Sequence, residues 1–122
     1  MKRILVADSS IYTKSVLRKL LTKTHFRIIA EADDGKQAVS KYVQSKPDFV
    51  LMDISLPKQN GFEALRQILK LDSNANIIMF STLFEPFLHS DLIKLGAKDF
   101  LSKPDFTGLI ASLHNIEQKQ HS

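Results

Sequence analysis

The stretch Phe49-Val50-Leu51-Met52-Asp53 decides the fold, because four apolar residues lead directly into a carboxylate. A short run of this kind is typical of a strand buried on both faces of a parallel sheet. Other short runs also lead into polar residues: residues 4–7 into Asp8, residues 77–80 into Ser81, and residues 100–101 through Ser102 into Lys103 and Pro104. Parallel strands share a carboxyl-terminal edge, so these polar residues should meet there. Two acids, a hydroxyl and an amine around one point suit a reaction of phosphate on a carboxylate.

Short apolar runs alternate five times with longer segments of helical period along the chain. The runs are residues 4–7, 28–30, 49–52, 77–80 and 100–101. Apolar spacings of three and four residues characterise the segments between them, as in Phe62, Leu65, Ile68 and Leu69. This alternation predicts an α/β protein of five βα units, in which helices cover both faces of a parallel sheet.

Polar residues and glycines mark the expected helix ends. Two pairs, each a capping side chain followed three residues later by Glu or Gln, predict helix starts: Asn60 with Glu63, and Asp34 with Gln37. Pro86 suits the first turn of the fourth helix, and Gly96 suits its end. Gly108 is expected inside the fifth helix.

Length and composition fit one globular domain spanning residues 1–122, because 122 residues with 43% hydrophobic content build a single core. The chain contains no cysteine, which excludes disulfides and thiolate metal sites. No stretch approaches the roughly 20 apolar residues that cross a bilayer. We therefore expect a cytoplasmic protein with no membrane partner.

The charge is mild, with 17 Lys and Arg against 13 Asp and Glu, a net of +4. No acid lies between Asp8 and Glu31, where five basic residues gather: Lys14, Arg18, Lys19, Lys23 and Arg27. The favoured interpretation is a solvated face, since no aromatic residues interleave with these charges. Contact with nucleic acid, acidic lipid or an acidic protein is the alternative. We expect no direct nucleic-acid binding.

Four motifs carry a family resemblance: Ile4-Leu5-Val6-Ala7-Asp8, Asp53-Ile54-Ser55-Leu56-Pro57 with Asn60-Gly61, Ser81-Thr82, and the stretch from Gly96 to Lys103-Pro104. In this order and spacing they resemble the receiver domain of two-component response regulators, in its single-domain form that is similar to chemotaxis regulators. The match spans nearly the whole chain. The resemblance implies a flavodoxin-like, doubly wound fold with strand order 2-1-3-4-5.

The resemblance also implies the roles of individual residues. Asp53 would take a phosphoryl group from a histidine kinase or phosphotransfer protein, with Lys103 and Ser81 completing the catalytic set. Ser81 and Phe100 match the family's switch positions, and the Lys103–Pro104 bond would be cis. Such a protein is no enzyme toward other substrates, since it catalyses only its own phosphorylation and dephosphorylation.

The resemblance further implies a Mg²⁺ site made by Asp8, Asp53 and the backbone carbonyl of Ser55. The family usually has two adjacent acids after the first strand, whereas Asp8 is followed here by Ser9. Mg²⁺ keeps several waters and needs only one or two carboxylates, so the site is expected to assemble with lower affinity. The Ser9 hydroxyl would reach the metal through a water or serve only the turn, and both interpretations stay open.

Two other classes compete with a phosphorylatable receiver. One is a pseudo-receiver, a protein-interaction module with weak or no metal-dependent phosphorylation because Ser9 replaces an acid. The other is an electron carrier or phosphatase of similar architecture. The retained Asp53, Ser81 and Lys103 favour the phosphorylatable receiver. The loop after Asp8 has no glycine to wrap a flavin phosphate, and Ser55 stands where such phosphatases carry a second acid.

A downstream protein or second protomer is expected on the face of residues 84–118, where Phe84, Phe87 and Leu88 supply apolar bulk and at least one of them serves the core. The four histidines lack ligand spacing and are expected as surface residues: His25, His89, His114 and His121. The cognate kinase, the output, the oligomeric state and membership of a longer regulator stay open.

Overall fold

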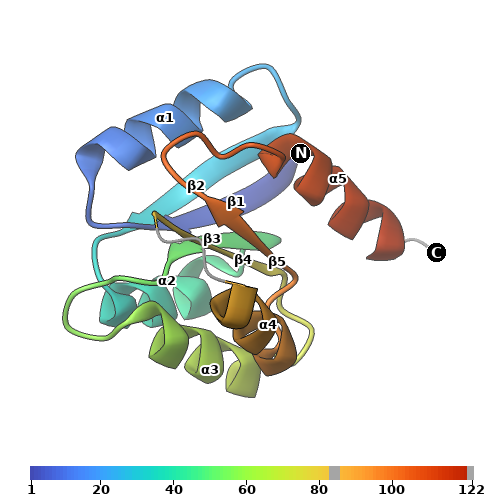
Figure 1. Cartoon of the computed structure of the whole chain (residues 1–122). Coiled ribbons are helices and arrows are strands. Elements are labelled where there is room, and N and C mark those ends of the chain that lie inside the picture. Colours follow the sequence, from blue (N-terminus) through green and yellow to red (C-terminus); the bar gives the residue numbers. More distant parts are fainter. Residues whose placement is uncertain (83–85, 121–122) are drawn as a thin grey trace.

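The computed structural model describes residues 1–82 and 86–120. Within them, strands and helices alternate strictly along the chain (Figure 1). The strands are β1 (Lys2–Ala7), β2 (Phe26–Ala32), β3 (Phe49–Asp53), β4 (Ile77–Ser81) and β5 (Asp99–Ser102). The helices are α1 (Ile11–Leu21), α2 (Gly35–Ser45), α3 (Gly61–Leu71), α4 (Pro86–Leu95) and α5 (Leu109–Gln120).

All neighbouring strands pair in parallel, in the order β2-β1-β3-β4-β5. This confirms the flavodoxin-like α/β prediction, including its strand order. Parallel pairing brings every carboxyl-terminal strand end to one edge, and the reversal of strand order between β1 and β3 opens the crevice where such folds bind ligands. Asp53 ends β3 at that point.

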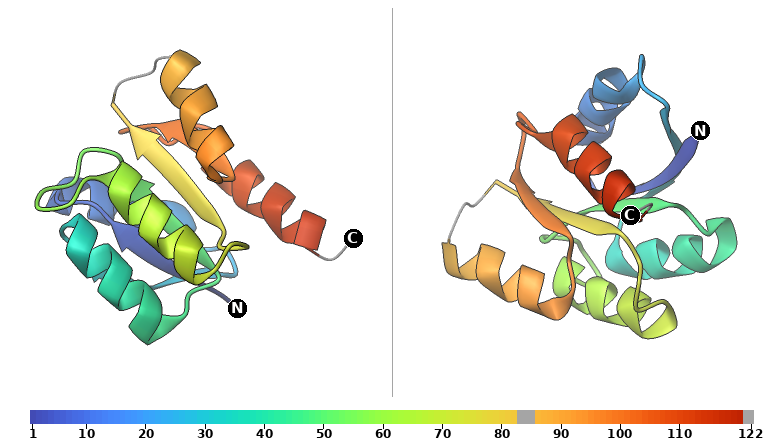
Figure 2. Two further views of the ribbon diagram at one scale, coloured as in Figure 1. Left: turned by 90° about the horizontal axis from the view of Figure 1, so that it is seen from below. Right: turned by 90° about the vertical axis from the view of Figure 1, so that its right-hand side faces the viewer.

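The sheet lies between two helical layers, with α1 and α5 on one face and α2, α3 and α4 on the other (Figures 1 and 2). Successive strand residues point to opposite faces, which explains why the central runs are apolar throughout. Val50 and Met52 pack beneath Leu65 of α3 in one cluster. Phe49 and Leu51 belong to the other cluster, with α1 and α5.

Short polar side chains cap three helices by accepting a hydrogen bond from a backbone N–H. Asp34 caps α2 through the Gln37 N–H at 2.8 Å, and Asn60 caps α3 through the Glu63 N–H at 2.9 Å. Both caps were predicted from the sequence and are confirmed. Ser10 caps α1 in the same way, and each cap contributes about 1 kcal/mol of stability.

The prediction for Gly108 was wrong, because α5 begins only at Leu109. Gly108 has a φ of 86° and precedes the first residue of the helix. Its carbonyl accepts the Ser112 N–H at 2.9 Å, so Gly108 occupies the position directly before α5. A left-handed conformation of this kind favours glycine. Gly96 has a φ of 121° directly after α4, which confirms it as the helix end.

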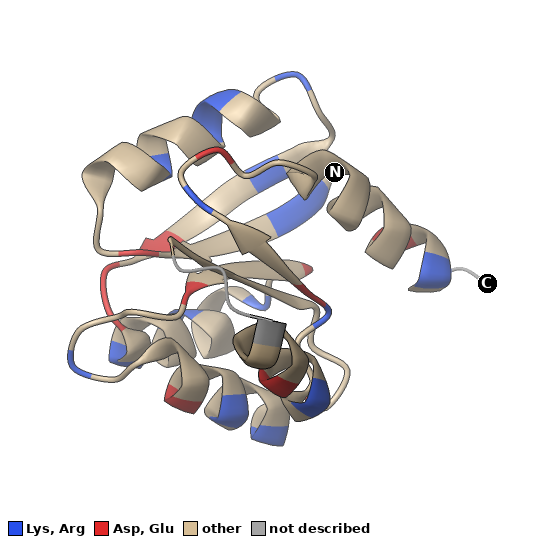
Figure 3. Cartoon of the chain, viewed as in Figure 1, with Lys and Arg blue, Asp and Glu red and all other residues tan. Residues whose placement is uncertain are grey.

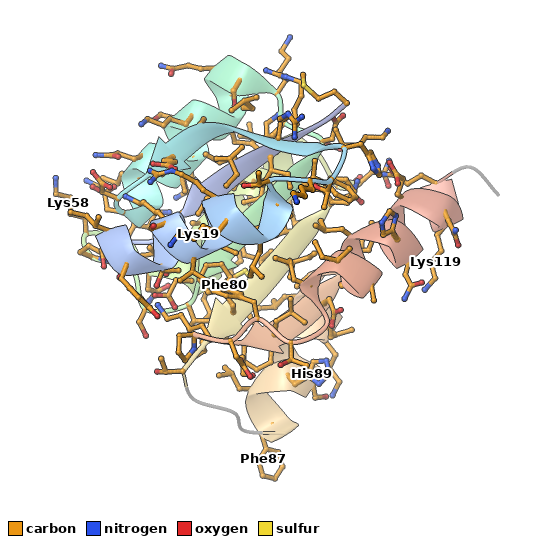
Figure 4. The ribbon with its side chains drawn as sticks, turned by 90° about the horizontal axis from the view of Figure 1, so that it is seen from above. Lys19, Lys58, Phe80, Phe87, His89 and Lys119 are labelled. Atoms are coloured by element: carbon orange, nitrogen blue, oxygen red, sulfur yellow. The ribbon has the colours of Figure 1, made fainter. Side chains whose placement is uncertain are left out.

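The basic segment is only in part a solvated face (Figure 3). Lys14 is buried and paired with Asp33, and the Arg18 Nε donates to Glu31 at 2.8 Å. Both acids come from the end of β2 and the loop after it, so the charges are balanced across chain segments. Lys19 stays on the outer side of α1 (Figure 4). None of the helices in the described part of the chain has the length and apolar content needed to span a bilayer.

Candidate functional site

Asp8, Asp53 and Lys103 meet at the carboxyl-terminal edge of the sheet. The Nζ of Lys103 lies 2.9 Å from Asp8 Oδ2 and 2.9 Å from Asp53 Oδ2. The side chains of Asp8 and Asp53 are only 1% and 6% exposed, and that of Lys103 is 13% exposed. One ammonium therefore bridges two buried carboxylates, which leaves the group with a formal charge of −1.

The second oxygen of each carboxylate is held by its own turn. Asp8 Oδ1 accepts the Ser10 N–H at 2.7 Å, which fixes the turn before α1. Asp53 Oδ1 accepts the Ser55 N–H at 3.3 Å. Both Oδ2 atoms are thereby oriented toward Lys103, and the site is built before any ligand arrives.

The start of α3 packs directly against the turn after β3. The Gly61 N–H donates to the Ile54 carbonyl at 2.8 Å, and a Cβ added at Gly61 would lie 2.4 Å from the carbonyl oxygen of Asp53. Only a glycine allows this approach without displacing the turn. The Asn60-Gly61 pair thus fixes the backbone that carries Asp53.

Lys103 is positioned by β4 and by the turn after β5. Its N–H donates to the Ser81 carbonyl at 3.0 Å, and its Nζ lies 5.6 Å from the centroid of the Phe80 ring, a cation–π distance. The Lys103–Pro104 peptide is cis, as the resemblance implied. The sequence pattern contains Phe80 only as a member of the apolar run 77–80 and does not predict this contact, because such a run does not reveal which ring lies beside a charged group.

Burial and charge act against each other at this site. Burial raises the pKa of the Asp53 carboxyl above its usual value, and the charge of Asp8 acts in the same direction, while Lys103 and the Ser55 N–H oppose the rise. Burial alone would lower the pKa of Lys103. The hydrogen bonds and attraction from Asp8 and Asp53 outweigh it and raise that pKa. Lys103 is therefore a cation at neutral pH.

The donor set fits a hard divalent cation. Asp8 and Asp53 offer carboxylate oxygens within one buried, net negative group, which suits Mg²⁺. Ser55 and Ser9 lie at the exposed rim of the site. An exposed Ser9 leaves room for water on the side where an additional carboxylate would otherwise stand.

Ser81 and Phe100 lie between this site and α4. Ser81 ends β4 and is buried, and it pairs with Ser102 of β5. Phe100 is also buried, within the cluster that includes Leu92 of α4, and its ring centroid lies 5.8 Å from that of His89. His89 is therefore half-buried against β5, which corrects its prediction as a surface residue.

The apolar residues expected at the start of α4 have different environments. Phe87 is 83% exposed and points away from the molecule (Figure 4). Leu88 packs against the core, as expected for at least one of these side chains. Phe84 lies outside the described residues. At the start of α1, three residues after Asp8 in the chain, Ile11 and Tyr12 are 81% and 68% exposed.

Comparisons with known proteins agree with this geometry. The response regulator receiver domain family matches residues 4–114. The chain is 41% identical over 103 residues to the chemotaxis protein CheY of Thermotoga maritima, a match that covers 84% of this chain and 86% of the relative. It is also 41% identical over 102 residues to CheY of Bacillus subtilis, covering 84% and 85%. A chain of the CheX–CheY–BeF3–Mg²⁺ complex from Borrelia burgdorferi superimposes with a TM-score of 0.89 at 35% identity, over 94% of this chain and 88% of that one.

The chain therefore belongs to the response regulator receiver domain family, of the CheY type. Its function is that of a phosphoacceptor in two-component signalling, and the pseudo-receiver alternative is not favoured. Receiver domains of this type generally depend on Mg²⁺, and they interact with kinases or phosphotransfer proteins and with downstream targets.

Proposed function

We propose that Asp53 of this receiver takes the phosphoryl group from a histidine kinase or phosphotransfer protein. The observation that carries the proposal is the ammonium of Lys103, 2.9 Å from an oxygen of Asp53 and 2.9 Å from one of Asp8. An isolated buried acid would serve equally as a turn former. A lysine held against two buried acids instead supplies positive charge where a phosphoryl group would arrive.

The chemistry requires a nucleophile in line with the leaving group and positive charge around three phosphoryl oxygens. An oxygen of the Asp53 carboxylate attacks phosphorus, the bond from phosphorus to the donor imidazole nitrogen breaks, and the imidazole leaves with its electron pair. Lys103 then exchanges its contact with Asp53 for one with a phosphoryl oxygen. Ser81, at the end of the neighbouring strand, donates its hydroxyl to another oxygen.

Asp8, Asp53 and the Ser55 backbone carbonyl are the residues that would hold Mg²⁺. When bound, the ion supplies positive charge to the phosphoryl oxygens. Asp8 is followed in the chain by Ser9 and not by a second acid. The affinity for Mg²⁺ is accordingly lower than with an additional carboxylate, and Ser9 contributes at most through a bound water.

The signal passes from Asp53 to the face of α4, β5 and α5 through Ser81 and Phe100. Phe87, 83% exposed on α4, supplies an apolar anchor for a downstream protein or a second protomer. Amide exchange measured with and without beryllofluoride tests this path. Changes in protection should appear between residues 87 and 100. Changes confined to the surroundings of Asp8 would contradict the path.

A single receiver domain accounts for residues 1–122, because both core clusters draw on β1, β3 and β4 together. We assign it no substrate other than its own phosphoryl group, which it both accepts and hydrolyses. A cytoplasmic location suits a partner that presents phosphohistidine, and a chain without cysteine suits a reducing compartment.

Incubation with a small phosphodonor and Mg²⁺, followed by intact mass measurement, tests the assignment. The wild-type chain should gain one phosphoryl group that is lost in base, as an acyl phosphate is. Asp53→Asn should gain none, and Asp34→Asn, which removes a cap acid elsewhere, should behave as wild type. A base-labile adduct that persists in Asp53→Asn would place the phosphoacceptor at another residue.

A further inference from the structure

A second cluster of potential ligands lies at the opposite edge of the sheet from Asp53. His25 directly precedes β2, while His114 and Glu117 are one helical turn apart on α5. One ligand atom of each lies within 4.8 Å of the others. The individual separations are 2.9 Å from His25 Nε2 to Glu117 Oε2 and 3.7 Å from His114 Nδ1 to Glu117 Oε1. The sequence spacing of 25, 114 and 117 gave no indication of this, because the fold brings the first residue to the other two.

We propose that His25, His114 and Glu117 form a binding site for a divalent transition-metal ion, with Zn²⁺ as the ion that fits best. Two imidazole nitrogens and one carboxylate oxygen are donors that Zn²⁺ accepts in four-coordinate sites, with water in the remaining position. Mg²⁺ prefers oxygen donors alone. The two edges of the sheet therefore carry sites of different chemical preference.

The observed distances suit tetrahedral coordination. Bonds of 2.0–2.1 Å place neighbouring ligand atoms of a tetrahedral zinc site about 3.3 Å apart. Measured to the same carboxylate oxygen, Glu117 Oε1, the separations are 3.0 Å from His25 Nε2 and 3.7 Å from His114 Nδ1, on either side of that value. The rings of His25 and His114 are 43% and 47% exposed, so both can rotate by the small amount needed. Their exposure also leaves a coordination position open to water.

The cluster is held in place from beneath by Phe26. Its ring is 1% exposed, and its centroid lies 4.2 Å from that of His25 and 5.4 Å from that of His114. The two imidazoles lie 5.5 Å apart on this platform. Binding therefore requires little ordering of side chains, which favours affinity. An ion here would tie α5 to the start of β2.

Zinc binding can be measured by calorimetry in a buffer that does not chelate metals, on the whole chain. Wild type should bind one equivalent, and Mg²⁺ in large excess should not displace it. His25→Asn, His114→Asn and Glu117→Gln should each weaken binding at least tenfold. His89→Asn is the matched control, since it removes a histidine outside the cluster, and it should bind as wild type does.

Thermal unfolding gives a second measurement that separates lost ligands from lost folding. Zn²⁺ should raise the melting temperature of wild type and of His89→Asn, but it should not change the melting temperature of the three cluster variants. Phosphorylation of Asp53 by a small phosphodonor, if these three variants retain it, would show that they fold. Absence of saturable Zn²⁺ binding by wild type, or undiminished binding by the cluster variants, would overturn the proposal. Loss of the zinc signal in Asp8→Asn would also overturn it, since the ion would then lie at the other edge.

Discussion

Replacement of Lys103 by Met removes the positive charge that contacts both Asp8 and Asp53, while it keeps most of the apolar stem. Each lysine–carboxylate separation is 2.9 Å, and gross attraction at an effective dielectric near 20 is about 6 kcal/mol per pair. Desolvation of the charges offsets much of this attraction. Removing one partner of a buried pair typically costs about 3–5 kcal/mol, and Asp53 can relieve part of the cost by taking up a proton. We expect Lys103→Met to lose about 3 kcal/mol of unfolding free energy at pH 7 without Mg²⁺.

The loss should depend on pH and on metal in a defined direction. The pKa of Asp53 is already raised by burial, and removal of Lys103 raises it further. A carboxyl whose pKa is higher in the folded than in the unfolded state destabilises the fold as the pH rises through that folded pKa. The deficit should therefore shrink as the pH is lowered from 7 toward the unfolded-state pKa of about 4. Without the ammonium, the formal charge of the site changes from −1 to −2, which attracts a divalent cation more strongly. Mg²⁺ should therefore stabilise Lys103→Met more than it stabilises wild type.

Urea unfolding in EDTA and in Mg²⁺ provides the measurement, and Lys58→Met is the matched control. Lys58 pairs with Asp34 at 3.6 Å, but its side chain is 69% exposed, so its loss should cost less than about 1 kcal/mol. If Lys103→Met matched Lys58→Met in stability at every pH, the two buried acids would not depend on Lys103, and the electrostatic account of the site would fail.

Three further predictions concern the metal site, the turn after β3 and the hydroxyl of Tyr42. Ser9→Asp should raise the affinity for Mg²⁺ roughly tenfold, about 1.4 kcal/mol, and Asp8→Ala should abolish measurable Mg²⁺ binding. Both variants are titrated with Mg²⁺ at fixed ionic strength, and an unchanged affinity in both would show that the metal does not bind at this edge. Gly61→Ala should lower the unfolding free energy measured in urea by about 1–3 kcal/mol, because the added Cβ would lie 2.4 Å from the Asp53 carbonyl oxygen. A variant as stable as wild type would show that the turn can move to accommodate the methyl group. Burial, with the hydrogen bond and charge of Asp72, raises the pKa of Tyr42 to about 12, so wild-type stability should fall relative to Tyr42→Phe as the pH rises from 10 to 12. Parallel stability curves for the two proteins over that range would refute this origin of the shift.

The fold could be predicted because local and global preferences agree along this chain. The run from Phe49 to Asp53 is apolar on both faces, which indicates a central strand, and Asp34 and Asn60 mark helix starts through their own side chains. Gly108 was misplaced because a glycine before a helix and one inside it look alike in a pattern of apolar spacings. Its positive φ is set by the turn after β5.

The meeting of Asp8, Asp53 and Lys103 followed from the shared edge of parallel strands, which needs no detailed packing. The contacts that were missed all join side chains distant in sequence. Lys14 pairs with Asp33 from another segment, and His25 reaches Glu117 across 92 positions. Contacts of this kind depend on which strand lies beside which helix. Spacing along the chain does not reveal them.

The central claim is that Asp53 carries the phosphoryl group. Borohydride reduction of the phosphorylated chain, followed by peptide mass mapping, locates an aspartyl phosphate because the reduced residue becomes homoserine. We predict homoserine at position 53, with unmodified aspartate at position 8. Homoserine at position 8, or at any residue other than 53, would contradict the account.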